Sequence, residues 1–149
     1  MRWLLLICAA TFTSCATRPG QLKDFQSDGC SSFPDGTLIH PRKWHAHCAK
    51  HDLAYWQGGT RAQRREADRE LIRGVRAEGH PVLACLMYSG VRIGGAPWWP
   101  TSWRWGFGWP YPRGYKVLDP NEQRQVNEVR AKIKRDSPGS AVRSSSGSK

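Results

Sequence analysis

The chain has 149 residues and a formal net charge of +11. This length leaves room for one domain and excludes a larger multidomain organisation. A protein this basic should be attracted to anionic surfaces, which include lipid headgroups, cell-wall polymers and nucleic acid, and the charge alone does not choose among them.

Residues 1–15 are typical of an export signal. A short basic start, Met1-Arg2, precedes an apolar run and then small or hydroxylated residues up to Cys15. The apolar run is too short to cross a bilayer as an ordinary helix. Cys15 resembles a bacterial lipoprotein acylation site; ordinary cleavage nearby or a retained anchor are the alternatives. We therefore expect an exported protein, either a lipoprotein of the bacterial cell envelope or a secreted one, with a linker over residues 16–23.

Helix-opening and helix-ending residues recur after a loop rich in Gly, Ser, Pro and Asp over residues 24–40. Thr60 is a good N-cap, and Asp119-Pro120 places a capping residue before a proline at the first helical position. The expected helices run from 41 to about 55 or 56, from 61 to about 78, from 81 to about 91, and from 120 to about 134.

No segment alternates convincingly between apolar and polar residues, so the fold class is predicted to be all-α. We expect the folded domain to cover residues 24–135. The remaining residues, 136–149, are rich in Ser and Gly and are predicted to be a disordered tail.

The first expected helix carries a polar face. Cys48, His51, Asp52 and Tyr55 follow one another at i, i+3, i+4 and i+7, which places them on one side of a helix. Burying such a face is costly unless the carboxylate finds a cation or hydrogen-bond donors. This face is therefore the strongest indication of a functional site.

The second expected helix carries Asp68 within its apolar stripe. Asp68, Leu71, Ile72 and Val75 again follow one another at i, i+3, i+4 and i+7. A short turn over 57–60 predicts that the two helices are antiparallel neighbours. His51 and Asp68 should then lie level, and the Tyr55 hydroxyl could donate to Asp68. Such a pair fixes the imidazole tautomer and supports a positive charge on the ring; the alternative is a structural hydrogen-bonded core.

Aromatic residues dominate the irregular segment 96–115. One interpretation is a membrane contact, because tryptophan prefers the headgroup region of a bilayer. The alternative is a loop packed over the helices in place of disulfides. Stacking on nucleic acid is the weaker interpretation, since no recognisable nucleic-acid module accompanies the aromatics. The tryptophans in question are Trp98, Trp99, Trp103, Trp105 and Trp109.

Three cysteines lie beyond the signal segment, namely Cys30, Cys48 and Cys85. Disulfides persist in exported proteins, and an odd number leaves one thiol unpaired. A zinc site is an alternative use of Cys48, because His47 and His51 have a recognised ligand spacing. No glutamate follows His47, which makes zinc the weaker interpretation.

Three parts of the sequence together resemble the secreted calcium-dependent phospholipase A2 family, closest to its small prokaryotic branch. They are Asp28-Gly29-Cys30, then Cys48-Ala49-Lys50-His51-Asp52-Leu53-Ala54-Tyr55, and then Asp68. The match covers residues 24–75. The resemblance implies a disulfide between Cys30 and Cys48, and Cys85 is then expected to be buried as a small apolar residue.

The resemblance also implies roles for individual residues. His51 would be the general base, Asp68 would orient it and Tyr55 would brace the aspartate. Calcium would be held by Asp52, Asp28 and the carbonyl of Gly29, with Asp35 as a possible replacement for or supplement to Asp28. The implied activity is hydrolysis of the sn-2 ester of glycerophospholipids, which releases fatty acid and lysophospholipid.

A second hypothesis is a non-catalytic envelope lipoprotein that binds an anionic membrane surface through its Trp/Arg-rich segment. The expected partners are phospholipid and an anionic membrane surface under either hypothesis. The sequence leaves the oligomeric state open.

Overall fold

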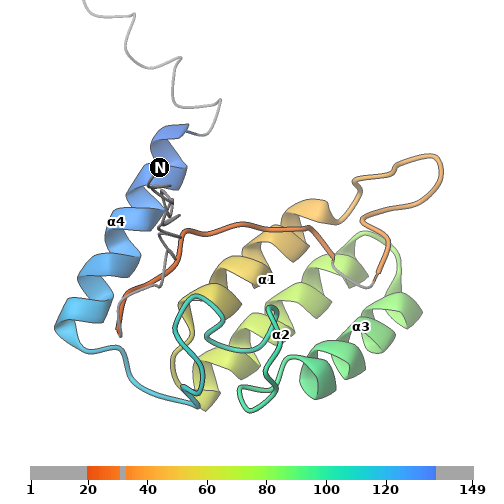
Figure 1. Cartoon of the computed structure of the whole chain (residues 1–149). Coiled ribbons are helices and arrows are strands. Elements are labelled where there is room, and N and C mark those ends of the chain that lie inside the picture. Colours follow the sequence, from red (N-terminus) through yellow and green to blue (C-terminus); the bar gives the residue numbers. More distant parts are fainter. Residues whose placement is uncertain (1–19, 31–32, 137–149) are drawn as a thin grey trace, which may run out of the picture.

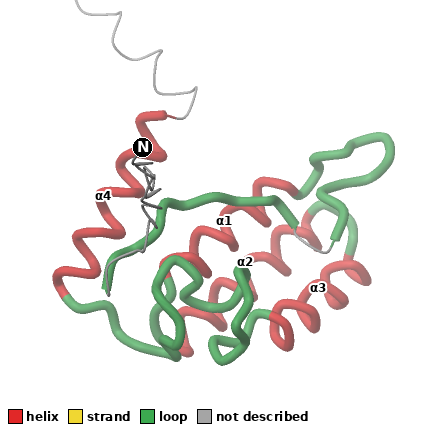
Figure 2. The backbone as a smooth tube through the Cα atoms, in the orientation of Figure 1, coloured by secondary structure: helices red, strands yellow, loops and turns green. Residues whose placement is uncertain are grey.

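A computed structural model describes residues 20–30 and 33–136 of the chain, and it contains four helices and no strand within those ranges (Figures 1 and 2). The helices are α1 (His45–Gln57), α2 (Arg61–Ala77), α3 (Pro81–Gly94) and α4 (Pro120–Asp136). The all-α prediction is therefore confirmed for this part of the chain. The predicted signal segment with Cys15, and the predicted tail from 137 onward, lie outside the described residues.

Helices α1, α2 and α3 lie side by side, with α2 in contact with both others (Figure 1). The turn between α1 and α2 is short and uses Gly58 and Gly59, whose φ angles are +71° and +130°. Thr60 then caps α2: its hydroxyl accepts from the Gln63 amide N–H at 3.2 Å, and the Gln63 side chain accepts from the Thr60 N–H at 2.8 Å. The antiparallel pair predicted from the sequence is present.

Helix α1 begins at His45, so the prediction that it begins at Pro41 is wrong. Residues 41–44 form turns instead. The backbone N–H of Trp44 donates to the carbonyl of Asp35 at 3.0 Å, and its indole donates to the carbonyl of Pro34 at 2.6 Å. These bonds tie the turn to the preceding loop and replace the hydrogen bonds that a longer helix would make.

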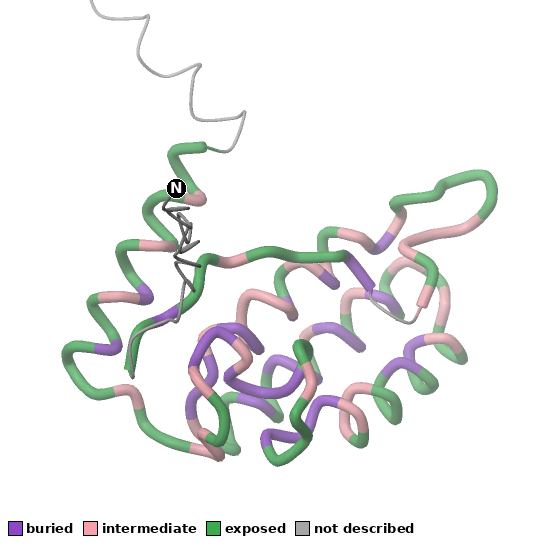
Figure 3. Tube along the Cα trace, in the orientation of Figure 1, coloured by how far each residue is buried: buried purple, intermediate pink, exposed green. Residues whose placement is uncertain are grey.

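The buried residues (purple in Figure 3) form three hydrophobic clusters, one near each end of α1 and a third of Tyr55, Ala67 and Trp105. Near the start of α1, Trp44 and Cys48 pack with Val75 of α2 and Met87 of α3. Near its end, Trp56 belongs to a separate cluster whose other buried members are Leu22, Trp109 and Val126. The helix face between the two clusters carries the polar residues of α1.

Two residues of the aromatic segment belong to the core. Trp105 and Trp109 are each 1% exposed, and their indoles donate to the carbonyls of Gly59 and Gln57 at 2.9 and 2.7 Å. The prediction that they contact a membrane is therefore wrong, because their ring surfaces and their polar N–H groups are already used inside the protein. The segment covers the turn between α1 and α2 (Figure 1).

The prediction that Cys85 is buried is also wrong, since it lies exposed on α3. Ala84 and Met87 carry the buried side of this helix, and position 85 points away from it. The Cys85 sulfur accepts from a guanidinium nitrogen of Arg76 at 3.3 Å.

Helix α4 starts as predicted, because the Asp119 side chain accepts from the N–H groups of Asn121 and Glu122 at 3.0 and 2.9 Å. It stands apart from the three-helix layer and packs through Val126 (Figure 1). Within the described residues, no helix is both long and apolar enough to cross a bilayer.

Candidate active site

The turn between α1 and α2 brings His51 and Asp68 level with each other. The imidazole Nε2 lies 2.9 Å from the Asp68 Oδ1, and the two residues are 7% and 0% exposed. The contact expected from the helix spacing is thus present, whereas its catalytic role stays a prediction. Because Asp68 engages Nε2, the tautomer favoured at neutral charge carries its proton there and leaves the Nδ1 lone pair free.

Asp68 has two further partners. The Tyr55 hydroxyl donates to Oδ1 at 2.8 Å, as the spacing predicted, and the Arg92 guanidinium donates to Oδ2 at 2.7 Å. Burial by itself would raise the pKa of Asp68, but the hydrogen bonds from His51, Arg92 and Tyr55 outweigh it and lower the pKa. Asp68 is therefore held as a carboxylate, the form that orients an imidazole.

Arg64 supports this arrangement through Tyr55, and the sequence did not predict this role. Its side chain is buried, and its Nε donates to the Tyr55 hydroxyl at 3.0 Å. Its Nη2 also donates to the carbonyls of Val91 and Arg92 at 2.8 and 2.9 Å. Arg64 precedes Asp68 by one turn and shares its inward stripe, so its position in the sequence did contain a signal.

His51 lines a cleft of about 540 Å³. No described residue makes a hydrogen bond to its Nδ1, which is therefore the ring nitrogen available to a molecule in the cleft. The walls combine polar groups of the loop before α1 with apolar and small residues of α3 and the aromatic segment. Among the latter are Met87, Gly90, Gly94 and Trp103. A neutral imidazole in a largely apolar cleft can act as a general base.

Oxygen donors from two segments line the same cleft. Asp52 follows His51 on α1, and Asp28 and Gly29 belong to the loop. The Ser27 hydroxyl donates to the Asp52 carboxylate at 2.6 Å. Burial raises the pKa of Asp52 to about 6, although the bond from Ser27 and the nearby imidazole act in the opposite direction. A half-buried carboxylate whose pKa is raised by desolvation is stabilised when a cation approaches it.

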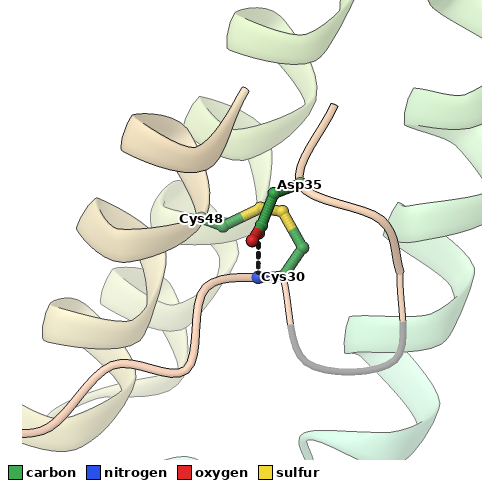
Figure 4. A group of neighbouring side chains, drawn as sticks. All are labelled: Cys30, Asp35 and Cys48. Atoms are coloured by element: carbon green, nitrogen blue, oxygen red, sulfur yellow. Dashed lines mark hydrogen bonds between the residues drawn. A yellow bond between two sulfur atoms is a disulfide. The ribbon is translucent and has the colours of Figure 1, made fainter. Parts of the chain in front are cut away.

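The Cys30–Cys48 disulfide ties that loop to α1, which confirms the predicted pairing (Figure 4). Asp35 lies beside it and accepts from the Cys30 N–H at 2.8 Å. Gly29 has a φ of +79°, and the Asp35 carboxylate fills the space that a side chain at Gly29 would need. Asp35 thus holds the loop, and it is absent from the residues that line the cleft.

A zinc site is not supported by this geometry. Cys30, Asp35 and Cys48 lie close enough to share a metal ion, but the two sulfurs are bonded to each other and offer no thiolate. The His47 ring lies 3.8 Å from the Glu78 carboxylate, on a side of α1 away from the cleft. The donors that remain in the cleft are oxygens of carboxylate, carbonyl and hydroxyl groups, which fit calcium better than zinc.

The predicted site residues therefore fall into two groups. His51, Asp52 and Tyr55 line one cleft together with the loop residues Asp28 and Gly29, and Asp68 holds the imidazole from behind. Trp105 and Trp109 lie in the core.

Comparison of the chain with protein-family models, with curated proteins and with solved structures finds no match.

Proposed function

We propose that the protein is a calcium-dependent phospholipase A2-like hydrolase, which cleaves the sn-2 ester of glycerophospholipids into fatty acid and lysophospholipid. One observation carries the proposal: a buried His51–Asp68 pair opens through the imidazole into a cleft that also presents the Asp52 carboxylate. Perturbed acid–base groups gathered in a cleft favour a functional site over a structural one.

In this mechanism His51 Nδ1 removes a proton from the water that attacks the ester carbonyl. Asp68 keeps the ring oriented and stabilises the positive charge that forms on it, and Tyr55 and Arg92 keep Asp68 in place. General base catalysis of this kind contributes about 10²–10⁴-fold to a rate.

Asp52, Asp28 and the carbonyl of Gly29 are the residues that would hold Ca²⁺. When bound, the ion would polarise the ester carbonyl as a Lewis acid. The disulfide fixes the loop donors relative to α1, which limits the ordering that ligand binding requires. We further propose that the protein acts after export, as an envelope lipoprotein or a secreted protein.

The second candidate function is a non-catalytic lipoprotein that binds an anionic membrane surface. The exposure of Trp98, Trp99 and Trp103 favours membrane contact, and this contact is compatible with either function. Hydrolysis separates the two candidates.

The test is fatty acid release from phospholipid vesicles, measured with calcium and with a chelator. We expect release only with calcium, and a loss of at least about 10²-fold in His51→Gln. Asp52→Asn should bind calcium more weakly and lose activity in parallel. His47→Gln is the matched control, because His47 lies on α1 outside the cleft and should retain activity. Release that persists in chelator or in His51→Gln would refute the mechanism.

A further inference from the structure

The disulfide between Cys30 and Cys48 lies among side chains that can bind a metal ion. The two sulfurs and a carboxylate oxygen of Asp35 all lie within 4.8 Å of one another (Figure 4). In the oxidised protein the sulfurs are bonded to each other and offer a metal no thiolate. Reduction changes the donor set, because it frees two sulfur ligands beside a carboxylate that is already in place.

The Asp35 carboxylate is oriented by the backbone around it. Its Oδ1 accepts from the Cys30 N–H at 2.8 Å. The Asp35 carbonyl accepts from the Trp44 N–H at 3.0 Å, which ties the residue to the turn before α1. These bonds do not involve sulfur, so they can hold the loop near α1 after the disulfide is reduced. A carboxylate that is hydrogen-bonded through one oxygen presents the other, here Oδ2, to a metal ion.

A nitrogen donor meets that second oxygen from α1. The Nδ1 atom of His45 lies 3.4 Å from the Asp35 Oδ2. This nitrogen is buried and has no hydrogen-bond partner among the described residues, whereas buried polar atoms normally have one. Zinc bonds of about 2.1 Å to nitrogen and oxygen place two tetrahedral ligands about 3.4 Å apart. The observed separation therefore fits two ligands of one metal ion better than it fits a direct hydrogen bond.

The four donors come in two pairs. His45 and Cys48 lie three residues apart on one face of α1, and Cys30 and Asp35 belong to the loop before it. His45 adjoins the other three through Asp35 and would complete the set as the fourth ligand. Two sulfurs with one nitrogen and one oxygen favour tetrahedral zinc, in which the sulfurs stand about 3.8 Å apart. The side chains of Asp35 and His45 are partly exposed, which gives the ion a path from solvent.

We propose that the reduced protein binds one Zn²⁺ through Cys30, Cys48, Asp35 and His45, and that oxidation of the two thiols releases the ion. Reduction by a dithiol transfers two electrons and two protons to the disulfide, and the dithiol becomes a disulfide. Zinc then displaces the two thiol protons. In the reverse direction, a disulfide oxidant accepts two electrons from the thiolates, the sulfur–sulfur bond forms again and Zn²⁺ leaves. This metal site is independent of the proposed hydrolysis.

The test uses the full chain with Cys8, Cys15 and Cys85 replaced by serine, so that Cys30 and Cys48 are its only thiols. The protein is reduced with a phosphine without oxygen, the phosphine is removed, and Co²⁺ is added as a spectroscopic probe. We expect the visible bands of tetrahedral Co²⁺ and a thiolate-to-cobalt charge-transfer band, which one equivalent of Zn²⁺ should abolish. The oxidised protein should show neither band. Their absence from the reduced protein would overturn the proposal.

Thermal unfolding followed by circular dichroism gives a second readout. Zinc should raise the unfolding temperature of the reduced protein and leave that of the oxidised protein unchanged, because only the reduced fold binds the ion. An unfolding temperature of the reduced protein that does not respond to zinc would contradict the proposal.

Two variants test the ligands that are not cysteines. Asp35→Asn keeps an acceptor for the Cys30 N–H but removes the charge, and His45→Gln removes the imidazole. The loss of an outer hydrogen-bond partner alone weakens metal binding 10- to 100-fold, so each variant should weaken zinc binding at least about 10-fold. His45→Cys should restore tight binding, since it supplies a third thiolate; a purely structural role for the imidazole would give no such rescue.

His47→Gln and His51→Gln are the matched controls, because their rings lie beside Glu78 and Asp68 instead. Both controls should bind zinc like the parent protein. Loss of binding in the controls, with binding retained in the two ligand variants, would assign the ion to the helix histidines and overturn the proposed ligand set. Equal affinity in all four variants would show an adventitious two-thiol site and would overturn it as well.

Discussion

At the level of single residues, the central feature is a carboxylate that is fully removed from solvent. Asp68 is 0% exposed and receives hydrogen bonds from His51, Tyr55 and Arg92. A buried charge without partners is very costly, so each donor contributes more here than it would on the surface. The dependence of Asp68 on Arg92 is the part that the sequence did not reveal.

Arg92→Gln should lower the free energy of unfolding by about 2–4 kcal/mol, because it leaves the Asp68 carboxylate short of a cation. Arg92→Lys should lose less, since it keeps the charge. The measurement is urea unfolding at pH 7. Arg73→Gln serves as the control: Arg73 pairs with Glu66 on the exposed side of α2, where an ion pair contributes at most about 1 kcal/mol. Equal losses in both variants would contradict this account.

Tyr55 connects two charged groups through one hydroxyl, which accepts from Arg64 and donates to Asp68. Burial first, and the Asp68 charge second, raise the pKa of Tyr55, so the phenol stays neutral and keeps its proton. Tyr55→Phe preserves the packed ring and removes both bonds.

We expect Tyr55→Phe to lower the free energy of unfolding by about 1–3 kcal/mol, because it leaves buried polar partners unsatisfied. Thermal or urea unfolding would measure this loss. Tyr88→Phe is a control of identical chemistry on the exposed part of α3 and should change stability by less than about 0.5 kcal/mol. A neutral result for Tyr55→Phe would mean that the hydroxyl does not bridge the two charges.

At the level of elements, the start of α4 concentrates ionic contacts on Glu122. Its carboxylate accepts from Arg113 at 3.0 Å and Lys116 at 2.8 Å, and it also accepts from the Asp119 N–H at 3.1 Å. Burial alone would raise the pKa of Glu122, but these contacts lower it to about 2. A carboxyl group whose pKa is lower in the folded than in the unfolded protein stabilises the fold at pH values above its unfolded pKa. That stabilisation is lost as the pH falls from about 4.5 to about 2.

Glu122→Gln should therefore cost about 1–3 kcal/mol of unfolding free energy at pH 7, and its difference from the unaltered protein should shrink as the pH falls toward 2. Urea unfolding across this pH range measures the effect. Glu128→Gln, at an exposed position of the same helix, should change the free energy of unfolding at pH 7 by less than about 0.5 kcal/mol. A Glu122→Gln deficit that is independent of pH would contradict the electrostatic explanation.

The helices and their polar faces could be predicted from the sequence because they follow from spacing and capping. His51, Tyr55 and Asp68 were found in this way. The start of α1 was missed because Trp44 bonds to a loop whose path no periodicity specifies. The same reason explains the aromatic segment: composition identified its tryptophans, but only the folded path separates buried Trp105 from exposed Trp103.

At the level of the whole molecule, the candidate site lies between two hydrophobic clusters that hold opposite ends of α1. The cluster near Trp56 depends on α4, which contributes Val126. Helix α4 supplies no residue to the cleft. Stability and chemistry are thus separable, because damage to the α4 contact should weaken the fold without altering the His51–Asp68 geometry.

Val126→Asp should lower the free energy of unfolding by about 3 kcal/mol or more, because it buries an unpaired charge in the cluster. Fatty acid release per folded molecule, measured well below the unfolding temperature, should remain close to that of the unaltered protein. Val117→Asp is the control, since Val117 is 71% exposed and should tolerate the charge. Complete loss of release in a folded Val126→Asp protein would show that α4 does contribute to the site.

The disulfide between Cys30 and Cys48 bears on when, after synthesis, the cleft is completed. It joins the segment carrying Asp28 and Gly29 to the helix carrying His51, so oxidation of the two thiols adds a covalent link between these two sides of the cleft. Under the proposed function, a newly made chain inside a reducing cytoplasm would lack that bond, and we expect it to hydrolyse the lipids of the producing cell less readily than the oxidised protein does. Fatty acid release that is unaffected by full reduction of the protein would show that no such delay exists.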